Sequence, residues 1–416
     1  MLQPTYADPA LIVPRGTLPT QLHAELTSSD AVKLLIAGQR GMGKTTELKR
    51  LLDLFSEHET ITVFVQFGAQ ESITNAMLVR IMAGGLVSAI DTRSDLPKQL
   101  HEPSAKTAKA LEYLRSWFFK QEFSIESEET EEGAAELGGS LKVMKASKGV
   151  KHSRKESQKR TRETNRDFDD LVDRFNMVIN AVRKESNKKV VFVVDDIDKI
   201  QNMDSVQSAF IHSAHVINRI DAPCVFTVPI TYATSSIVRM GALPYGEIYR
   251  VPAVEVLFES GQDNKQAFAF MREVLKRRMP SNPIPLPVLD QIIRCSGGVI
   301  VDALRIARNI CKKNFLEQIA VDDALLKEEF QKLVDDYVFV FDTPELWKKL
   351  DGLCTTSSKS AIMTDAALPQ LLYKMIAIEY RGKSLWFDLH PAARELYRQK
   401  VTVIQRCKPI GSGGAP

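Results

Sequence analysis

Residues 38–46 read GQRGMGKTT, a stretch whose residue types and spacing could bind phosphate. Gly38, Gly43, Lys44 and Thr45 meet the pattern G-x-x-x-x-G-K-[ST]. Glycines let the backbone N–H groups of such a loop turn toward one anion, and the N-terminus of a following helix adds partial positive charge. The lysine of this pattern reaches the β- and γ-phosphates, and the hydroxyl ligates Mg²⁺. The predicted site for Mg²⁺ and ATP or ADP consists of Gly38, Gln39, Arg40, Gly41, Met42, Gly43, Lys44, Thr45 and Thr46.

A second acidic motif could supply the carboxylate that this metal needs. Five valine and phenylalanine residues, 190–194, are followed by Asp195 and Asp196. A carboxylate at the carboxyl end of a central parallel strand can hold Mg²⁺ through water beside such a loop. We therefore expect Asp195 to serve the metal. Many ATPases carry a glutamate at the position of Asp196 to polarise the attacking water, and an aspartate is one methylene shorter, which predicts slow turnover.

The flanking segments are those that must position these groups. Residues 32–37 (VKLLIA) are short, leucine-rich and β-branched, as expected of a buried parallel strand. Residues 45–55 place Leu48, Leu51, Leu52 and Phe55 on one helical face. Residues 205–236 are expected to form a helix and then a strand. His212 and His215 on that helix have no third ligand nearby in the sequence and are interpreted as packing or surface residues.

Composition limits the class of protein. The chain of 416 residues is long enough for about two or three domains, and its 44% hydrophobic and 26% charged residues are typical of soluble proteins. Five scattered cysteines without a CxxC pair argue against a disulfide framework or zinc site. The N-terminus lacks the pattern of a signal peptide, and no apolar run approaches the roughly 20 residues of a membrane helix. We expect a cytoplasmic protein with no membrane partner.

Three motifs, GQRGMGKTT, VVFVVDDIDK and SGGVIVDALRIAR, together resemble the AAA+/STAND branch of P-loop ATPases. The chain is most similar to prokaryotic members with a C-terminal winged helix, and similar also to origin-recognition initiators. The resemblance implies an α/β fold with a P-loop (ASCE/AAA+-like) parallel-sheet domain, a helical lid and a C-terminal winged helix. The expected boundaries are 1–255 for the ATPase domain with a charged insertion at about 122–166, 256–336 for the lid, 337–405 for the winged helix and 406–416 for a flexible tail.

The resemblance also implies further contacts with the nucleotide. A polar γ-phosphate sensor is expected at the end of the strand that contains Thr227, with Thr231 in reserve. Pro14 and Arg15 precede the first strand, where the family cradles adenine. His390 resembles the winged-helix histidine that contacts the β-phosphate of ADP in STAND proteins, although a residue before Pro391 could instead belong only to a helix cap.

Arginines that contact the nucleotide are harder to assign. Family members carry a lid arginine where this chain has Val301, and Arg305 and Arg308 are the candidates to substitute for it. An arginine finger from a neighbouring subunit would imply a ring or filament. Arg239 is the candidate for that finger.

Two regions raise the question of nucleic-acid binding. The insertion has an acidic half and a basic half, Lys142–Arg162, which has no aromatic residues and predicts either non-specific backbone contact or a solvated loop whose halves attract each other. A helix is expected only after it, at 167–184. The winged-helix recognition helix, around 365–375, offers only Lys374 and Gln370, which favours a packing role.

These observations predict an ATP-binding, slowly hydrolysing molecular switch whose nucleotide state controls self-assembly or binding of a protein effector. A role in prokaryotic signalling or antiviral defence is implied by the resemblance alone. A DNA-dependent ATPase or loader of the initiator type is the alternative, and a nucleotide-binding scaffold without turnover is a third.

Overall fold

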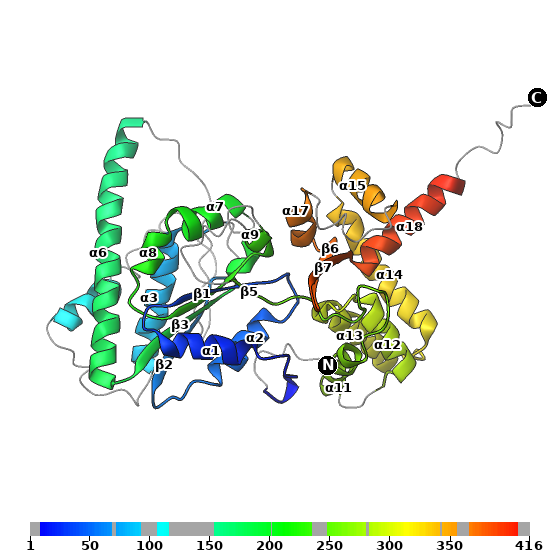
Figure 1. Ribbon diagram of the computed structural model, residues 1–416, viewed down its shortest axis with the longest axis horizontal. Helices are drawn as coiled ribbons and strands as arrows, with labels where there is room; N and C mark the ends of the chain where they lie inside the picture. Colours follow the sequence, from blue (N-terminus) through cyan, green and yellow to red (C-terminus); the bar gives the residue numbers. More distant parts are fainter. Residues whose placement is uncertain are drawn as a thin grey trace, which may run out of the picture. The chain divides into compact units, whose positions relative to one another are not determined.

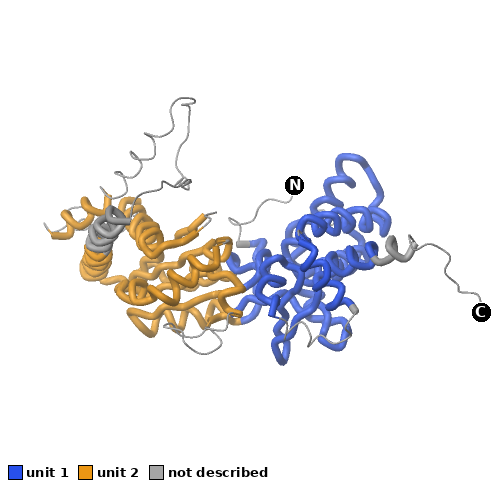
Figure 2. Tube along the Cα trace, turned by 90° about the horizontal axis from the view of Figure 1, so that it is seen from above, with its two compact units in different colours: residues 1–16, 38–46, 250–416 blue, residues 17–37, 47–249 orange. Residues whose placement is uncertain are grey.

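The computed structural model describes residues 9–68, 72–92, 106–115, 154–200, 202–234, 248–279, 283–341, 343–355 and 366–406. The chain divides into two compact units (Figure 2). Unit 1 comprises residues 1–16, 38–46 and 250–416, and unit 2 comprises residues 17–37 and 47–249. The glycine-rich loop is therefore grouped with the C-terminal half of the chain, although the strand before it belongs to unit 2.

A five-stranded parallel sheet forms the centre of unit 2 (Figure 1). Its order is β2-β3-β4-β1-β5, with β1 (Lys33–Ala37), β2 (Thr60–Gln66), β3 (Lys189–Asp195), β4 (Cys224–Val228) and β5 (Ile248–Arg250). Every residue of β1 and β4 is buried, as is β3 from Val190 onward. Such runs of apolar residues without alternation are typical of parallel strands covered on both faces. The predicted α/β sheet is confirmed.

Helices cover this sheet. They are α1 (Leu18–Ser28), α3 (Asn75–Thr92), α6 (Arg154–Ser186), α7 (Met203–Gln207), α8 (Ala214–Asn218) and α9 (Ile230–Thr234), with a 3-10 turn at Ile197–Lys199 and a π-helical turn at Ser208–His212. Helix α3 packs on β2 and α6 on β3, where the rings of Phe175 and Phe192 meet edge to face at 5.4 Å. The expected start of α6 at residue 167 is wrong, because the helix already begins at Arg154.

Unit 1 is mainly helical. After a 3-10 turn at Pro9–Leu11, it contains α11 (Lys265–Arg277), α12 (Leu286–Cys295), α13 (Ile300–Glu317) and α14 (Asp323–Val340). Gly297 and Gly298 separate α12 from α13 with φ values of +59° and +79°, a conformation that glycine adopts without steric cost. This confirms the expected break between two helices at the glycine pair.

The C-terminal elements of unit 1 follow in the order helix, helix, hairpin, helix. They are α15 (Pro344–Thr355), α17 (Leu368–Tyr373), the antiparallel pair β6 (Ala377–Arg381) and β7 (Leu385–Leu389), and α18 (Pro391–Arg406). Residues 366–406 are called the C-terminal module below. Its assignment as part of a winged helix stays a prediction.

Helix α2 (Lys44–Leu52) directly follows the glycine-rich loop.

Two expectations about chemistry and location can be compared with the described residues. Cys224, Cys295, Cys311 and Cys354 are free thiols. Among the described helices, none is both long and apolar enough to cross a membrane.

Candidate functional site

The loop 38–43 requires its glycines for reasons visible in the backbone. Gly41 and Gly43 have φ values of +79° and +94°, in the left-handed region that favours glycine. At Gly38 an added Cβ would lie 2.5 Å from the carbonyl oxygen of Val251. The three glycines of the loop therefore permit two left-handed turns and one close approach of backbone to backbone.

Lys44 lies at the end of this loop and is buried. Its Nζ donates hydrogen bonds to the carbonyl oxygens of Gly38, at 2.7 Å, and Gln39, at 2.8 Å. The ammonium group is thus held over the loop by two acceptors that a phosphate would compete with. Thr45 and Thr46 follow in the first turn of α2 and are half-buried.

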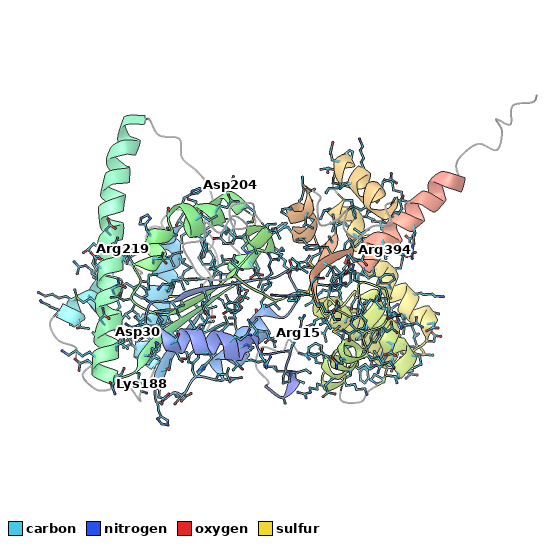
Figure 3. The ribbon with its side chains drawn as sticks, viewed as in Figure 1. Arg15, Asp30, Lys188, Asp204, Arg219 and Arg394 are labelled. Carbon is cyan, nitrogen blue, oxygen red and sulfur yellow. The ribbon has the colours of Figure 1, made fainter. Side chains whose placement is uncertain are left out.

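Arg15, which is labelled in Figure 3, contacts the loop through the carbonyl of Met42. Its guanidinium donates to the carbonyl oxygens of Met42 at 3.3 Å, Pro252 at 2.7 Å and Ala253 at 2.8 Å. Pro14 beside it is exposed. Arg15 therefore positions the loop through backbone carbonyls, and the contact of Pro14 and Arg15 with adenine stays a prediction.

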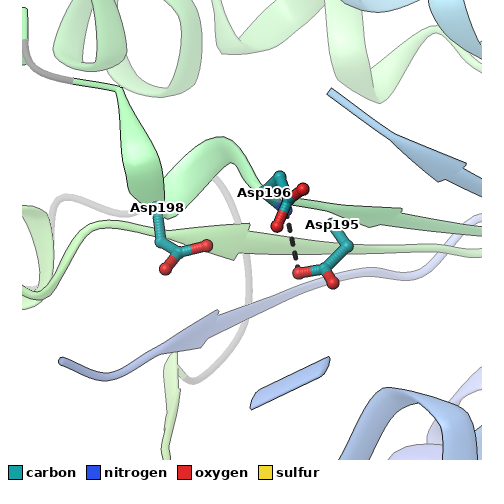
Figure 4. Close-up of side chains that lie close together, drawn as sticks. All are labelled: Asp195, Asp196 and Asp198. Carbon is teal, nitrogen blue, oxygen red and sulfur yellow. Dashed lines mark hydrogen bonds between the residues drawn. The ribbon is translucent and has the colours of Figure 1, made fainter. Parts of the chain in front are cut away.

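Three carboxylates gather at the carboxyl end of β3, within unit 2 (Figure 4). Oxygens of Asp195, Asp196 and Asp198 lie within 4.8 Å of one another, and all three side chains are buried. Carboxylate oxygens are ligands that Mg²⁺ prefers. The sequence interpretation missed Asp198. The D-D-x-D spacing after an apolar strand was the signal available, because the turn that follows β3 carries the third aspartate back to the first two.

Asp196 has partners for both its backbone and its side chain. Its backbone adopts a φ of +73°, and its N–H donates to Oδ1 of Asp195 at 2.8 Å. Its carboxylate Oδ1 lies 2.6 Å from Nζ of Lys199. Burial by itself lowers the pKa of Lys199, but the hydrogen bond to Asp196 and the three nearby aspartate charges outweigh it and raise that pKa. Lys199 therefore stays charged and holds Asp196 in an ion pair.

Thr227 lies in β4, the strand between β3 and β1. It is completely buried, and its hydroxyl oxygen has no hydrogen-bond partner among the described residues. A buried hydroxyl without a partner is costly and uncommon in native proteins. Thr231, the reserve candidate, has its hydroxyl 2.9 Å from the sulfur of Met203. Of the two, Thr227 has the free hydroxyl that a phosphate sensor needs.

His390 connects β7 to α18 within the C-terminal module, and its ring faces Asp302 of α13. It is completely buried, and its ring stacks on Tyr337 at 4.9 Å with 21° between the planes. Nδ1 accepts from the N–H of Ala392 at 3.1 Å, so the proton belongs on Nε2, which lies 3.0 Å from the Asp302 carboxylate. Both ring nitrogens have protein partners, and the contact of His390 with ADP stays a prediction.

The lid arginines and the insertion complete the predicted set. Val301 donates its N–H to the Gly41 carbonyl at 3.3 Å, so the N-terminus of α13 contacts the loop by backbone. Arg305 pairs with Asp336 of α14, and Arg308 is exposed.

The arginine-finger candidate Arg239 lies outside the described residues, as do residues 142–153 of the basic half of the insertion. For residues 154–162 the structure describes only the helical backbone.

The sheet order, the glycine loop that follows β1 and the aspartate that ends β3 define a P-loop nucleoside-triphosphatase domain. Residues 21–214 match the model of the KAP family P-loop domain. This match confirms the predicted P-loop domain.

Solved structures of similar proteins include three archaeal ones. The Walker-type ATPase of Pyrococcus abyssi is 11% identical over 94% of this chain and 99% of that chain, with a TM-score of 0.45. The ORC1 protein of Aeropyrum pernix, solved in complex with DNA, is 11% identical over 97% of both chains, with a TM-score of 0.43. A STAND protein with a tetratricopeptide repeat sensor from Pyrococcus horikoshii is 11% identical over 96% of this chain and 46% of that chain, with a TM-score of 0.29. No curated protein matches the chain.

Proposed function

We propose that this protein is an ATP-binding, slowly hydrolysing molecular switch whose nucleotide state controls self-assembly or the binding of a protein effector. One observation carries the proposal. The loop 38–46 belongs to the same compact unit as the helices and hairpin of the C-terminal half, and Val301 and Val251 contact it directly. A ligand that changes this loop therefore acts on those elements without an intermediary.

The residues fit a nucleotide with its metal. The left-handed glycines at 41 and 43, the close approach at Gly38 and the unpartnered hydroxyl of Thr227 are features that a bound phosphate would explain. Lys44 would bind the β- and γ-phosphates, Thr45 and Asp195 would hold Mg²⁺, and Thr227 would donate to the γ-phosphate. The metal would supply neutralisation of the charge that develops on the transferred phosphoryl group.

Slow turnover is supported by the state of Asp196. A general base works when its carboxylate is free to accept a proton or to orient water. Asp196 instead shares its carboxylate with a charged lysine, and its short side chain starts from a left-handed backbone. We expect the bound triphosphate to persist long enough to act as a signal, as a role in prokaryotic signalling or antiviral defence would require.

A DNA-dependent ATPase or loader is the second candidate. One observation favours it: the last part of the basic segment, residues 154–162, belongs to helix α6. A helix rich in lysine and arginine would suit non-specific contact with nucleic acid. Such contact would make the affinity fall steeply with salt.

The test begins with the freshly purified full-length protein, which is denatured so that any released nucleotide can be identified. Stoichiometric ADP supports the switch, whereas an empty site together with hydrolysis stimulated by duplex DNA supports the loader. Lys44→Ala should lower nucleotide affinity by roughly 100-fold or more, because it removes charge-assisted hydrogen bonds worth about 1.5–3 kcal/mol each. Lys276→Ala, at an exposed position on α11, is the matched control. Tight binding by Lys44→Ala would refute the assignment of the loop.

A further inference from the structure

The side chain of Gln39, the second residue of the glycine loop, is buried among backbone groups of the C-terminal module. Its Nε2 donates to the carbonyl oxygens of Leu372 at 2.8 Å and Ala377 at 2.7 Å. Its Oε1 accepts from the N–H of Glu379 at 2.8 Å. Both donors and the oxygen of the amide are thus used. Another side chain at this position would leave buried peptide groups unpaired, which is unfavourable.

The amide of Gln39 takes the place of a neighbouring β-strand. The carbonyl of Ala377 and the N–H of Glu379 flank Ile378, and they are the two groups that one residue of a parallel neighbour would bond. Ala253 extends this pairing by donating its N–H to the Glu379 carbonyl at 2.9 Å. Strand β7 occupies the opposite edge of β6. The edge of β6 that does not face β7 is therefore hydrogen-bonded by Gln39 of the glycine-rich loop and by Ala253.

The turn before β6 places two carbonyl groups within hydrogen-bonding distance of this amide. Met375 adopts φ +60°, which is unfavourable for a residue other than glycine. The N–H groups of Met375 and Ile376 donate to the carbonyls of Leu372 and Leu371, which is the Schellman pattern that usually places glycine at 375. This conformation aims the Leu372 carbonyl and the following Ala377 carbonyl at the same nitrogen of Gln39.

The backbone of Gln39 is also tied to the residue that would bind phosphate. Its carbonyl accepts from Nζ of Lys44. Phosphates that draw Lys44 toward themselves would weaken this bond and free the backbone of residue 39. The side chain and the carbonyl of one residue thus connect the predicted nucleotide site to β6.

From this geometry we infer that Gln39 is a latch that couples phosphate binding in the loop to release of the β6 edge. The inference rests on the proposed function, since it assumes that the loop binds a nucleotide. It goes further by naming the residue that transmits the change and the strand that receives it. Coupling between two sites is reciprocal, so loss of the latch must raise nucleotide affinity by the factor with which nucleotide loosens β6.

The experiment follows hydrogen exchange of the Glu379 amide, whose acceptor is the latch itself, in the full-length protein. Exchange is measured without nucleotide and with a slowly hydrolysed ATP analogue and Mg²⁺. In the wild-type protein the analogue should speed exchange by about 5–150-fold, the usual range for coupled sites. Gln39→Met, of similar size but without the amide, should exchange fast without nucleotide, respond little to it, and bind the analogue more tightly by a similar factor.

Two further variants make the result specific. Gln39→Glu keeps an acceptor for Glu379 but cannot donate to the two carbonyls, so it should also release the edge and provides a second test if Gln39→Met folds poorly. Gln370→Met changes an exposed glutamine on α17 and should behave as wild type. Unchanged or weaker affinity in both Gln39 variants, with a normal response at Glu379, would overturn the latch while leaving the switch intact. Failure of the wild-type protein to bind the analogue would instead overturn the proposed function.

Discussion

Nζ of Lys199 lies 2.6 Å from Oδ1 of Asp196, and the two residues are three positions apart in the turn that follows β3. Asp196 is the residue that the sequence predicts to polarise the attacking water. A carboxylate that is held in an ion pair with a charged lysine is not free to accept a proton or to orient water. If the protein hydrolyses ATP as we propose, this ion pair should restrain hydrolysis, and the size of the effect can be measured.

Breaking this pair should speed hydrolysis. Lys199→Gln frees the Asp196 carboxylate, and single-turnover hydrolysis of ATP should rise by roughly tenfold, a smaller factor than the 10²–10⁴ that a positioned base contributes in full. Asp196→Asn should slow it by about 10²-fold because the base is lost. Lys276→Gln, exposed on α11, serves as the control. A slower Lys199→Gln enzyme would mean that the lysine assists the reaction.

A pair of glycine substitutions tests the geometry of the loop. Gly38→Ala places a Cβ 2.5 Å from the backbone oxygen of Val251, which cannot turn aside as a side chain would, so we expect a loss of about 1–3 kcal/mol in the free energy of unfolding and weaker nucleotide binding. Gly352→Ala in helix α15 meets no atom within 4 Å and should stabilise by about 0.5–1 kcal/mol. Thermal unfolding of both variants gives the comparison. Equal effects would contradict the close approach at Gly38.

Removal of the buried hydroxyl of Thr227 should affect stability and hydrolysis in different ways. Thr227→Val keeps the shape and removes an unpartnered polar atom, so stability should be unchanged or higher, on the order of 1 kcal/mol, while hydrolysis falls by about 10²-fold if the hydroxyl serves the γ-phosphate. Thr234→Val provides the contrast because its hydroxyl donates to the carbonyls of Ile230 and Thr231. That variant should lose about 0.5–1 kcal/mol and keep its hydrolysis rate. Normal hydrolysis by Thr227→Val would remove the sensor assignment.

The elements predicted from the sequence are those whose pattern is local. Apolar runs without alternation indicate β1, β3 and β4, and the glycine–lysine motif between β1 and α2 indicates the loop. The start of α6 at Arg154 was missed because its first turns have no apolar period. The lysine, arginine, glutamate and glutamine there are good helix formers, and intrinsic propensity was the signal.

Contacts between distant residues could not be predicted in this way. Gln39 and Glu379 are 340 positions apart, and nothing in the identity of a glutamine within a glycine-rich loop indicates that its amide completes a strand edge. Strand β5 has three half-buried residues, too few to show a period, and its place beside β1 depends on the rest of the sheet. Such features follow from tertiary packing, which overrides local preference.

Stability of unit 1 should depend on the protonation of Glu379. The side chain is buried, one of its oxygens has no partner, and the other pairs with Arg250 at 2.5 Å. Burial raises the pKa of this carboxyl above its ordinary value of 4.5, and Arg250 and Arg381 offset that only in part. The folded state therefore binds the proton more tightly than the unfolded chain does. The ionised carboxylate of Glu379 therefore destabilises the fold at pH values above its folded-state pKa, and this effect fades as the pH falls toward 4.5.

The variant Glu379→Gln tests this, because its side chain is neutral at every pH. It should unfold at a higher temperature than wild type at pH 7–8, and the difference should shrink toward pH 4.5. The same change at the exposed Glu345 is the control. A variant that is less stable than wild type at pH 7–8 would show that the ion pair with Arg250 outweighs the cost of burying the charge.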